Sequence, residues 1–172
     1  IEIQPMRAEN FDTWMILIGI LINAAAPPIS AWLSDAYPKS SPTGSVFLSA
    51  FTTKTAVLAL ILLFPGEPVL IGVGLFMVMY GIIYALLEND IRRILAFSIV
   101  NQVGFMVCAV GIGTQMAING AAAHAFAHII YKALLFMSAG AVIYRTGFNK
   151  CSEVGGLFRT MPYTALCGII GA

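Results

Sequence analysis

Two lysines stand in the middle of apolar stretches that are otherwise typical of membrane spans. Lys54 follows Phe51-Thr-Thr, and Lys132 lies within the apolar run 117–144. A charge at the centre of a bilayer costs about 2.5–3.5 kcal/mol on insertion scales, and such residues usually mark a path for protons or ions or face an opposite charge. The two lysines are therefore the first candidates for a function.

Lys132 ends a stripe of titratable residues at four-residue spacing, in which His124 and His128 precede it. On a helix each such step turns by about 40°, so the three side chains lie within about 80° of arc and about 12 Å of length. Histidine can pass protons through either ring nitrogen, and single waters can link groups one turn apart. The stripe predicts a proton relay. A metal site and structural hydrogen bonding are the alternatives, although Ala125 stands where a metalloprotease needs Glu.

Lys54 is a second candidate for proton transfer. A lysine in a low-dielectric span can exchange a proton near neutral pH, and a carboxylate that moves toward it or away would switch it. Snorkelling does not explain it, because an interface lies about 12–15 Å from mid-span. The neighbouring Thr53 could contact the ammonium in a hydrated path or bond back to its own helix. Ser98, Asn101 and Gln102 predict either helix–helix packing or a further part of such a path.

The composition places these residues in a membrane protein. Of the 172 residues, 59% are hydrophobic and 10% are charged, whereas a soluble domain has about 25% charged residues. The net charge of +1 gives no indication of nucleic-acid binding. Three scattered cysteines, without a CxxC or Cys/His cluster, predict no disulfide framework, no metal or iron–sulfur centre and no other cofactor.

Apolar runs predict five complete spans and the beginning of a sixth. Most complete runs have about the 17–25 residues that cross a hydrocarbon core, and the run with the stripe is longer, so we expect it to tilt, break or project. The fold class is therefore all-α, a polytopic transmembrane helix bundle in a single membrane domain. Because the sequence begins without Met and stops inside an apolar run, we expect an internal fragment of a longer chain. The runs are 14–31, 45–64, 69–87, 95–112, 117–144 and 162–172.

The distribution of basic residues predicts an orientation. If successive connections alternate between the two sides, one side collects six basic residues and the other has only Arg7. Basic residues near span ends favour the cytoplasmic side. We therefore expect the connections 35–43, 88–93 and 145–161 to face the cytoplasm, or the matrix or stroma of an organelle. The six residues are Lys39, Arg92, Arg93, Arg145, Lys150 and Arg159.

Four stretches resemble, in order, motifs of the antiporter-like membrane subunits. That family occurs in respiratory complex I, Mrp-type multisubunit cation/proton antiporters and membrane-bound hydrogenases. The first stretch runs from Pro28 to Ser45 and is followed by Lys54-Thr55. The resemblance covers roughly 20–162 and implies a fold of roughly 14 helices, with inverted repeats and broken helices, of which this sequence is a part. The other three stretches are 89–98, 98–105 and 124–140.

The resemblance also implies roles for the candidate residues. The lysine at Lys54 would pair with a glutamate on an earlier helix outside this sequence. His128 and Lys132 would belong to a hydrophilic axis that links two half-channels. The apolar run 69–87 departs from the pattern because it has no Lys or His. Either water links Lys54 to His124, or this member is a poorer conductor. Gln102 stands where some relatives have His.

These features predict an ion-translocating subunit that works with other membrane subunits of a multisubunit complex in a lipid bilayer. The transported ion is expected to be the proton, with Na⁺ as the alternative. The complex would resemble either NADH:quinone oxidoreductase or an Mrp-type cation/proton antiporter, and we do not expect this chain to be catalytic alone. A structural scaffold that has lost conduction is the rival hypothesis. We expect the bacterial inner membrane, with an organellar membrane as the alternative.

Overall fold

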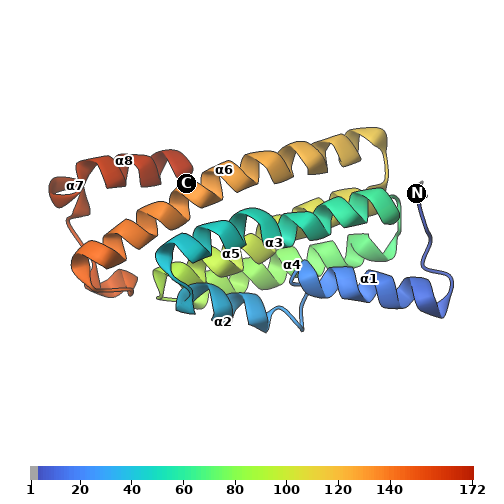
Figure 1. Cartoon of the computed structure of the whole chain (residues 1–172), viewed down its shortest axis with the longest axis horizontal. Coiled ribbons are helices and arrows are strands. Elements are labelled where there is room, and N and C mark those ends of the chain that lie inside the picture. The colour runs from blue at the N-terminus through green and yellow to red at the C-terminus, as the bar shows by residue number, and fades with distance from the viewer. Residues whose placement is uncertain (1–3) are drawn as a thin grey trace.

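The computed structural model describes residues 4–172, and four long apolar helices make up most of it. Their length and composition are sufficient to cross a membrane. They run side by side along the long axis of the molecule (Figure 1). The four are α3 (Pro42–Leu63), α4 (Val69–Leu87), α5 (Ile91–Ile112) and α6 (Gln115–Thr146). The shorter elements are α1 (Phe11–Asn23), α2 (Ala31–Lys39), the 3-10 helix η1 (Cys151–Glu153), α7 (Leu157–Thr160) and α8 (Pro162–Gly171).

Side-chain caps set the starts of three long helices. The Ser41 hydroxyl accepts a hydrogen bond from the Gly44 amide at the start of α3. Asp90 accepts from two amides of α5, and Thr114 accepts from an amide in the first turn of α6. Each such cap satisfies donors that the helix cannot satisfy itself, and removing one typically costs about 1 kcal/mol. At its other end α6 stops at Gly147, which has a φ of +76° that favours glycine.

The chain turns between α1 and α2, where the apolar run predicts a single span over 14–31. Pro27-Pro28 lies in this turn, and neither residue has an N–H to continue helical hydrogen bonding. The Trp32 indole donates a hydrogen bond of 3.0 Å to the Ile22 carbonyl, so the start of α2 is tied to the end of α1. The run 14–31 thus covers the last ten residues of α1, a turn and the first residue of α2, and the expected polar connection after it contains the rest of α2.

The other apolar runs coincide with helices. Several helices begin or end beyond the predicted apolar runs, because capping residues and the polar or small residues next to them also belong to the helix or its ends. The connection 145–161 is not wholly irregular, because it contains η1 and α7. The runs 69–87, 95–112 and 117–144 lie in α4, α5 and α6, while 45–64 and 162–172 each end one residue beyond α3 and α8.

Glycines allow α4 and α5 to approach each other closely. A Cβ on Gly81 would lie 2.5 Å from the Asn101 amide nitrogen, and one on Gly74 would lie 2.5 Å from the Cys108 amide nitrogen. Small residues at helix contacts are typical of membrane proteins, where close backbone packing replaces the hydrophobic driving force. The glycines of α4 therefore have a packing role. On the other sides of the bundle, α6 packs against α3 and α5, and α8 packs against α6.

The basic connections meet at one end of the bundle. The Ile91 amide donates to the Asn149 carbonyl at 2.9 Å, and Arg92 Nη1 donates to the carbonyls of Pro38 and Ser40. At the opposite end the Met6 amide donates to the Leu63 carbonyl. The prediction that 35–43, 88–93 and 145–161 share one end is confirmed. Its assignment to the cytoplasmic side stays a prediction.

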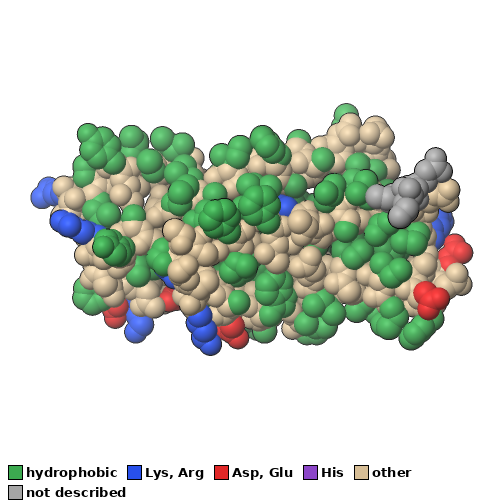
Figure 2. Space-filling model, viewed as in Figure 1, with side chains coloured by type: hydrophobic (Ala, Val, Ile, Leu, Met, Phe, Trp, Pro, Cys, Tyr) green, Lys and Arg blue, Asp and Glu red, His purple; other side chains and the backbone are tan. Residues whose placement is uncertain are grey.

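The surface agrees with a bilayer environment. Figure 2 shows hydrophobic side chains along the whole visible face, while Lys and Arg gather at the left end and along the adjoining lower edge. Phe126, Ile130 and Met137 on α6 are more than half exposed, as are Leu75 and Phe76 on α4. Apolar contact surface of this kind on long helices is what lipid tails cover.

Candidate functional site

Lys54 lies inside the bundle on the side of α3 that faces its neighbours. The side chain is only 6% exposed. Its Nζ donates to the Ser49 carbonyl at 2.7 Å and to Thr53 Oγ1 at 3.2 Å. The lysine therefore extends back toward the start of its own helix, the direction in which helical side chains point. Its partners in the described part of the chain are neutral oxygens.

Two members of the stripe on α6 are held by side chains of α5. Lys132 Nζ donates to Ser98 Oγ at 2.7 Å, and His124 Nε2 lies 2.9 Å from Gln102 Oε1. Ser98 and Gln102 are four residues apart on one face of α5, whereas Lys132 and His124 are eight residues apart on α6, so the two contacts converge on α5. The helix pair thus holds both ends of the stripe with neutral polar groups.

His128 lies in the middle of the stripe and is fully buried. Its ring packs edge-on against Tyr131 with centroids 5.0 Å apart, and the His124 ring is 6.0 Å away. Neither Nδ1 nor Nε2 has a hydrogen-bond partner among residues 4–172. Buried polar atoms normally have partners, and exceptions often occur at functional sites or next to bound water.

Lys54 and the stripe belong to one polar region because α3 packs directly against α6. Lys54, His128 and Lys132 are all buried in this pair of helices. The tyrosines of α4, Tyr80 and Tyr84, stack instead against each other and against Phe97 of α5. The absence of Lys and His from 69–87 therefore does not separate Lys54 from the stripe, since α4 does not lie between them.

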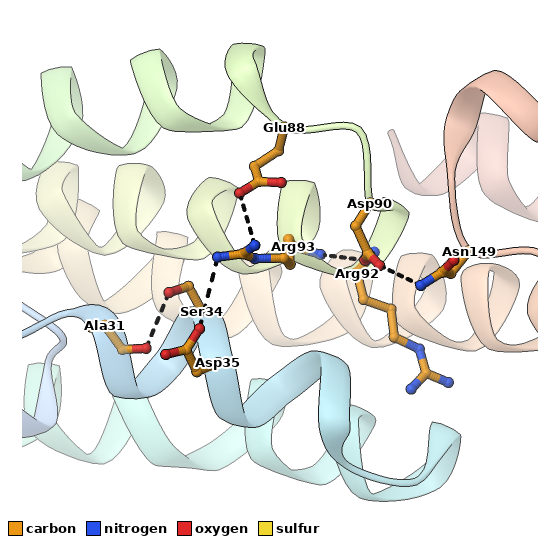
Figure 3. Close-up of polar contacts among 8 residues, drawn as sticks. All are labelled: Ala31, Ser34, Asp35, Glu88, Asp90, Arg92, Arg93 and Asn149. Carbon is orange, nitrogen blue, oxygen red and sulfur yellow. Dashed lines mark hydrogen bonds and ion pairs between the residues drawn. The ribbon is translucent and has the colours of Figure 1, made fainter.

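The basic groups of the polar region have no ion-pair partner in the part of the chain that the structure describes. Lys132 is 4% exposed, and neither it nor Lys54 has a carboxylate within 4 Å in the described chain. The ion pairs lie at the basic end, where Arg93 contacts Asp35 at 3.8 Å and Glu88 at 3.4 Å (Figure 3). Buried cations without a counter-charge are expensive and are typical of sites that exchange protons or ions.

The remaining polar candidates divide between contact with the site and packing. Thr53 contacts Lys54, whereas the Asn101 amide donates to the Val78 carbonyl of α4 at 3.0 Å and joins two helices. Ser49 was not among the residues predicted from the sequence. Its carbonyl accepts from Lys54, and its buried hydroxyl has no partner among residues 4–172. The signal was present, because a lysine on a helix reaches back about one turn.

Within residues 4–172 there is no group of three or more His, Cys, Asp or Glu side chains that could hold a metal ion. His124 and His128 alone provide two ligands, and a structural zinc site needs four. What the geometry offers is a row of groups that can each hold or release a proton, surrounded by hydroxyl, amide and carbonyl oxygens.

Comparison with known proteins gives the same family from several directions. A family model described as NADH:quinone oxidoreductase/Mrp antiporter, transmembrane, matches residues 5–172. NADH-quinone oxidoreductase subunit L of Buchnera aphidicola is 36% identical over 96% of this chain and 29% of that protein. A Na⁺/H⁺ antiporter subunit of Alkalihalophilus pseudofirmus is 32% identical over 99% of this chain and 36% of that protein.

Solved structures share the fold. In the Mrp complex of a Dietzia species, one chain matches with a TM-score of 0.87 and 30% identity, over 92% of this chain and 31% of that chain. An archaeal membrane-bound sulfane sulfur reductase matches with a TM-score of 0.83 and 29% identity, over 91% of this chain and 34% of that chain. The chain thus spans about a third of the length of these relatives. It is an integral membrane protein that belongs to the NADH:quinone oxidoreductase/Mrp antiporter family.

Proposed function

We propose that this chain moves protons across a membrane and that Lys54, His124, His128 and Lys132 carry them. The observation that carries the proposal is the burial of Lys54 and Lys132 in helices of spanning length, with neutral oxygens as their hydrogen-bond partners. A structure that needed only packing would gain stability from apolar residues at these positions. Retained buried cations support a transport function.

The proposed path begins at Lys54 and continues along α6. Lys54 exchanges its proton with the stripe through bound water, and His128 receives it because its ring is the member of the stripe without a direct partner in the described chain. Lys132 and His124 lie one helical turn to either side, so the proton can move in small steps. Thr53, Ser98 and Gln102 orient the carriers through their hydrogen bonds. A carboxylate elsewhere in the protein would switch Lys54.

The proposed setting is a complex of several membrane subunits in the bacterial inner membrane. Relatives named as subunits of NADH-quinone oxidoreductase, hydrogenase-4 and Na⁺/H⁺ antiporters support such an assembly. Energy would come from electron transfer in partner subunits or from a gradient of a second ion such as Na⁺. Purification in mild detergent followed by mass spectrometry separates these cases. Flavin or iron–sulfur subunits among the co-purifying proteins would indicate the first, and their absence beside other membrane subunits would indicate the second.

The direct test is Lys54→Met in the protein assembled in its native membrane. We expect proton movement into inverted vesicles to fall at least about tenfold, since a proton carrier typically contributes about 10²-fold or more. The exposed Lys150→Met is the control and should transport at the wild-type rate. Both variants must show wild-type amounts of assembled complex. Full transport by Lys54→Met would remove Lys54 from the path and favour the non-conducting scaffold.

A further inference from the structure

Arg92, at the basic end of the bundle, is a buried cation without an acidic partner among the described residues. It is 8% exposed. Its Nη1 donates to the carbonyls of Pro38 at 3.1 Å and Ser40 at 2.9 Å, both neutral acceptors. Within residues 4–172 no carboxylate lies within ion-pair distance of it, and its Nε and Nη2 donate no hydrogen bond. A guanidinium has five N–H donors, so most of its donor capacity is unused.

The carboxylate of Asp90, two residues before Arg92, already has other partners. Asp90 Oδ1 accepts from the amides of Arg92 and Arg93, and Oδ2 accepts from the Asn149 side chain at 2.7 Å. Figure 3 shows the Arg92 side chain extending away from Asp90, toward the ribbons of α2 and α3. Its neighbour Arg93 differs, since it contacts two carboxylates. An anion from outside this part of the chain would therefore stabilise the buried charge of Arg92.

A polar cavity provides the place for such an anion. It has a volume of about 430 Å³ and is lined by Lys39, Arg92, Asp90 and Asn149, together with parts of α2 and the end of α6. Two cations and one capped carboxylate leave it positive. The first turn of α3, whose N-terminus is favourable for negative charge, begins three residues after Lys39. The site suits a phosphate group.

An apolar groove lies next to this cavity along α6. It has a volume of about 260 Å³, lies between α3 and α6, and is lined by Pro42, Thr43, Val46, Met137 and Tyr144 among others. Ile143 and Gly147 of the polar cavity lie one turn closer to the end of α6 than Gly140 and Tyr144 of the groove. From the basic end toward the middle of the bundle, a site for an anion is thus followed by an apolar groove. A phospholipid has the same order, with its phosphate followed by its acyl chains.

We propose that the polar cavity and the groove together bind one anionic phospholipid. Arg92 and Lys39 hold its phosphate, and an acyl chain lies between α3 and α6. Basic pockets between spanning helices on the cytoplasmic side suit anionic headgroups. The lipid supplies the counter-charge for Arg92 and joins α2, α3, α5 and α6 at one end. The site is independent of proton transfer, so its test contains no transport measurement.

The experiment measures lipid retained by the protein purified with its accompanying subunits. The protein is placed in nanodiscs of equal phosphatidylglycerol and phosphatidylcholine and extracted again, and bound lipid is counted by mass spectrometry. We expect phosphatidylglycerol to be retained in preference. Lys39→Gln should lower its retention about fivefold, because one basic group contributes about 1 kcal/mol at such a surface. Thr43→Trp, at an exposed position, should fill the groove and lower retention as well.

The matched control is Arg159→Gln, which removes the same charge from α7 outside the cavity. It should retain lipid as the wild type does. An equal loss in Lys39→Gln and Arg159→Gln would assign the preference to diffuse surface charge and overturn the proposal. Wild-type retention by Thr43→Trp would overturn the groove as the acyl site. Displacement of the lipid by millimolar inorganic phosphate would make the cavity a site for a free anion and also overturn it.

Discussion

Gln102 and Asn101 are adjacent amides on α5 with different partners. Gln102 Oε1 lies against the His124 ring, whereas Asn101 donates to a carbonyl of α4. The nitrogen of His124 that carries its proton is set by the hydrogen bond that the ring makes. Gln102 therefore fixes the state of a proposed carrier, and Asn101 fixes the position of a helix.

These two amides can be tested against each other. Gln102→Leu should slow proton transport about fivefold, because it removes one hydrogen bond worth about 1 kcal/mol to the stripe. Gln102→Glu keeps an acceptor at the same place and should recover part of the rate while changing its pH profile. Asn101→Leu should lower thermal stability with transport per assembled complex unchanged. The measurement is proton transport in vesicles. A wild-type rate for Gln102→Leu would contradict this role for Gln102.

The stripe itself can be tested by combining changes. His128→Ala together with Lys132→Met should slow transport more than either change alone. When one of the two residues is missing, the proton can still reach the other through bound water. The measurement is proton uptake by vesicles that contain equal amounts of complex. A double variant with the wild-type rate would leave the stripe with a packing role.

Much of the candidate site is visible in the sequence at the residue scale. The four-residue spacing places the stripe on one face of a helix whatever the fold, and the structure keeps His128 and Lys132 buried. What spacing does not give is the partner of each group. Ser98 and Gln102 meet the stripe only because α5 and α6 pack in one register. The Ser49 carbonyl is different, because the reach of a helical lysine back along its own helix points to it without any knowledge of the fold.

At the scale of elements, the contact between α4 and α5 depends on glycine. Gly81 leaves no space for a Cβ, because the nearest atom would be the Asn101 amide nitrogen at 2.5 Å. Gly72 is on the same helix with nothing within 4 Å of the position of a Cβ. A change from glycine to alanine at each position therefore compares a packed site with an open site on the same helix.

Gly81→Ala should therefore destabilise the protein by roughly 1–3 kcal/mol through overpacking. Gly72→Ala should be neutral or slightly stabilising, since alanine favours the helix over glycine. Thermal unfolding in one detergent compares the two variants directly. Equal melting temperatures would show that α4 and α5 separate at little cost.

The helices were predictable where the apolar run and the capping residues indicate the same beginning and end. The runs that lie in α3 to α6 are long and have clear ends. The run 14–31 is different, because hydrophobicity continues through a turn that Pro27-Pro28 requires and that Trp32 ties to α1. Hydropathy counts apolar residues and does not record that proline cannot donate, so the helix ends earlier than the apolar run.

At the scale of the whole molecule, the arrangement of basic residues has a direct consequence for labelling. Cys151 is exposed at the end where the Ile91 amide donates to the Asn149 carbonyl, and Gly66 lies at the opposite end. In a variant without the other cysteines, Cys151 should react with a membrane-impermeant maleimide only from the cytoplasmic side. A cysteine introduced by Gly66→Cys should react only from the other side. Reaction of both from one side would contradict the topology.

The length of α6 allows both of its ends to project beyond the hydrocarbon core of a bilayer. Its 32 residues extend about 48 Å at about 1.5 Å per residue, more than the hydrocarbon thickness of about 30 Å. A helix that is longer than the bilayer is thick can tilt. Tilting about the midpoint of the helix changes the depth of its ends and leaves the depth of the midpoint unchanged. His128 and Lys132 lie on either side of that midpoint. Membranes of different thickness should therefore shift Tyr144 and the basic end relative to the headgroups, while the two residues remain at the mid-plane.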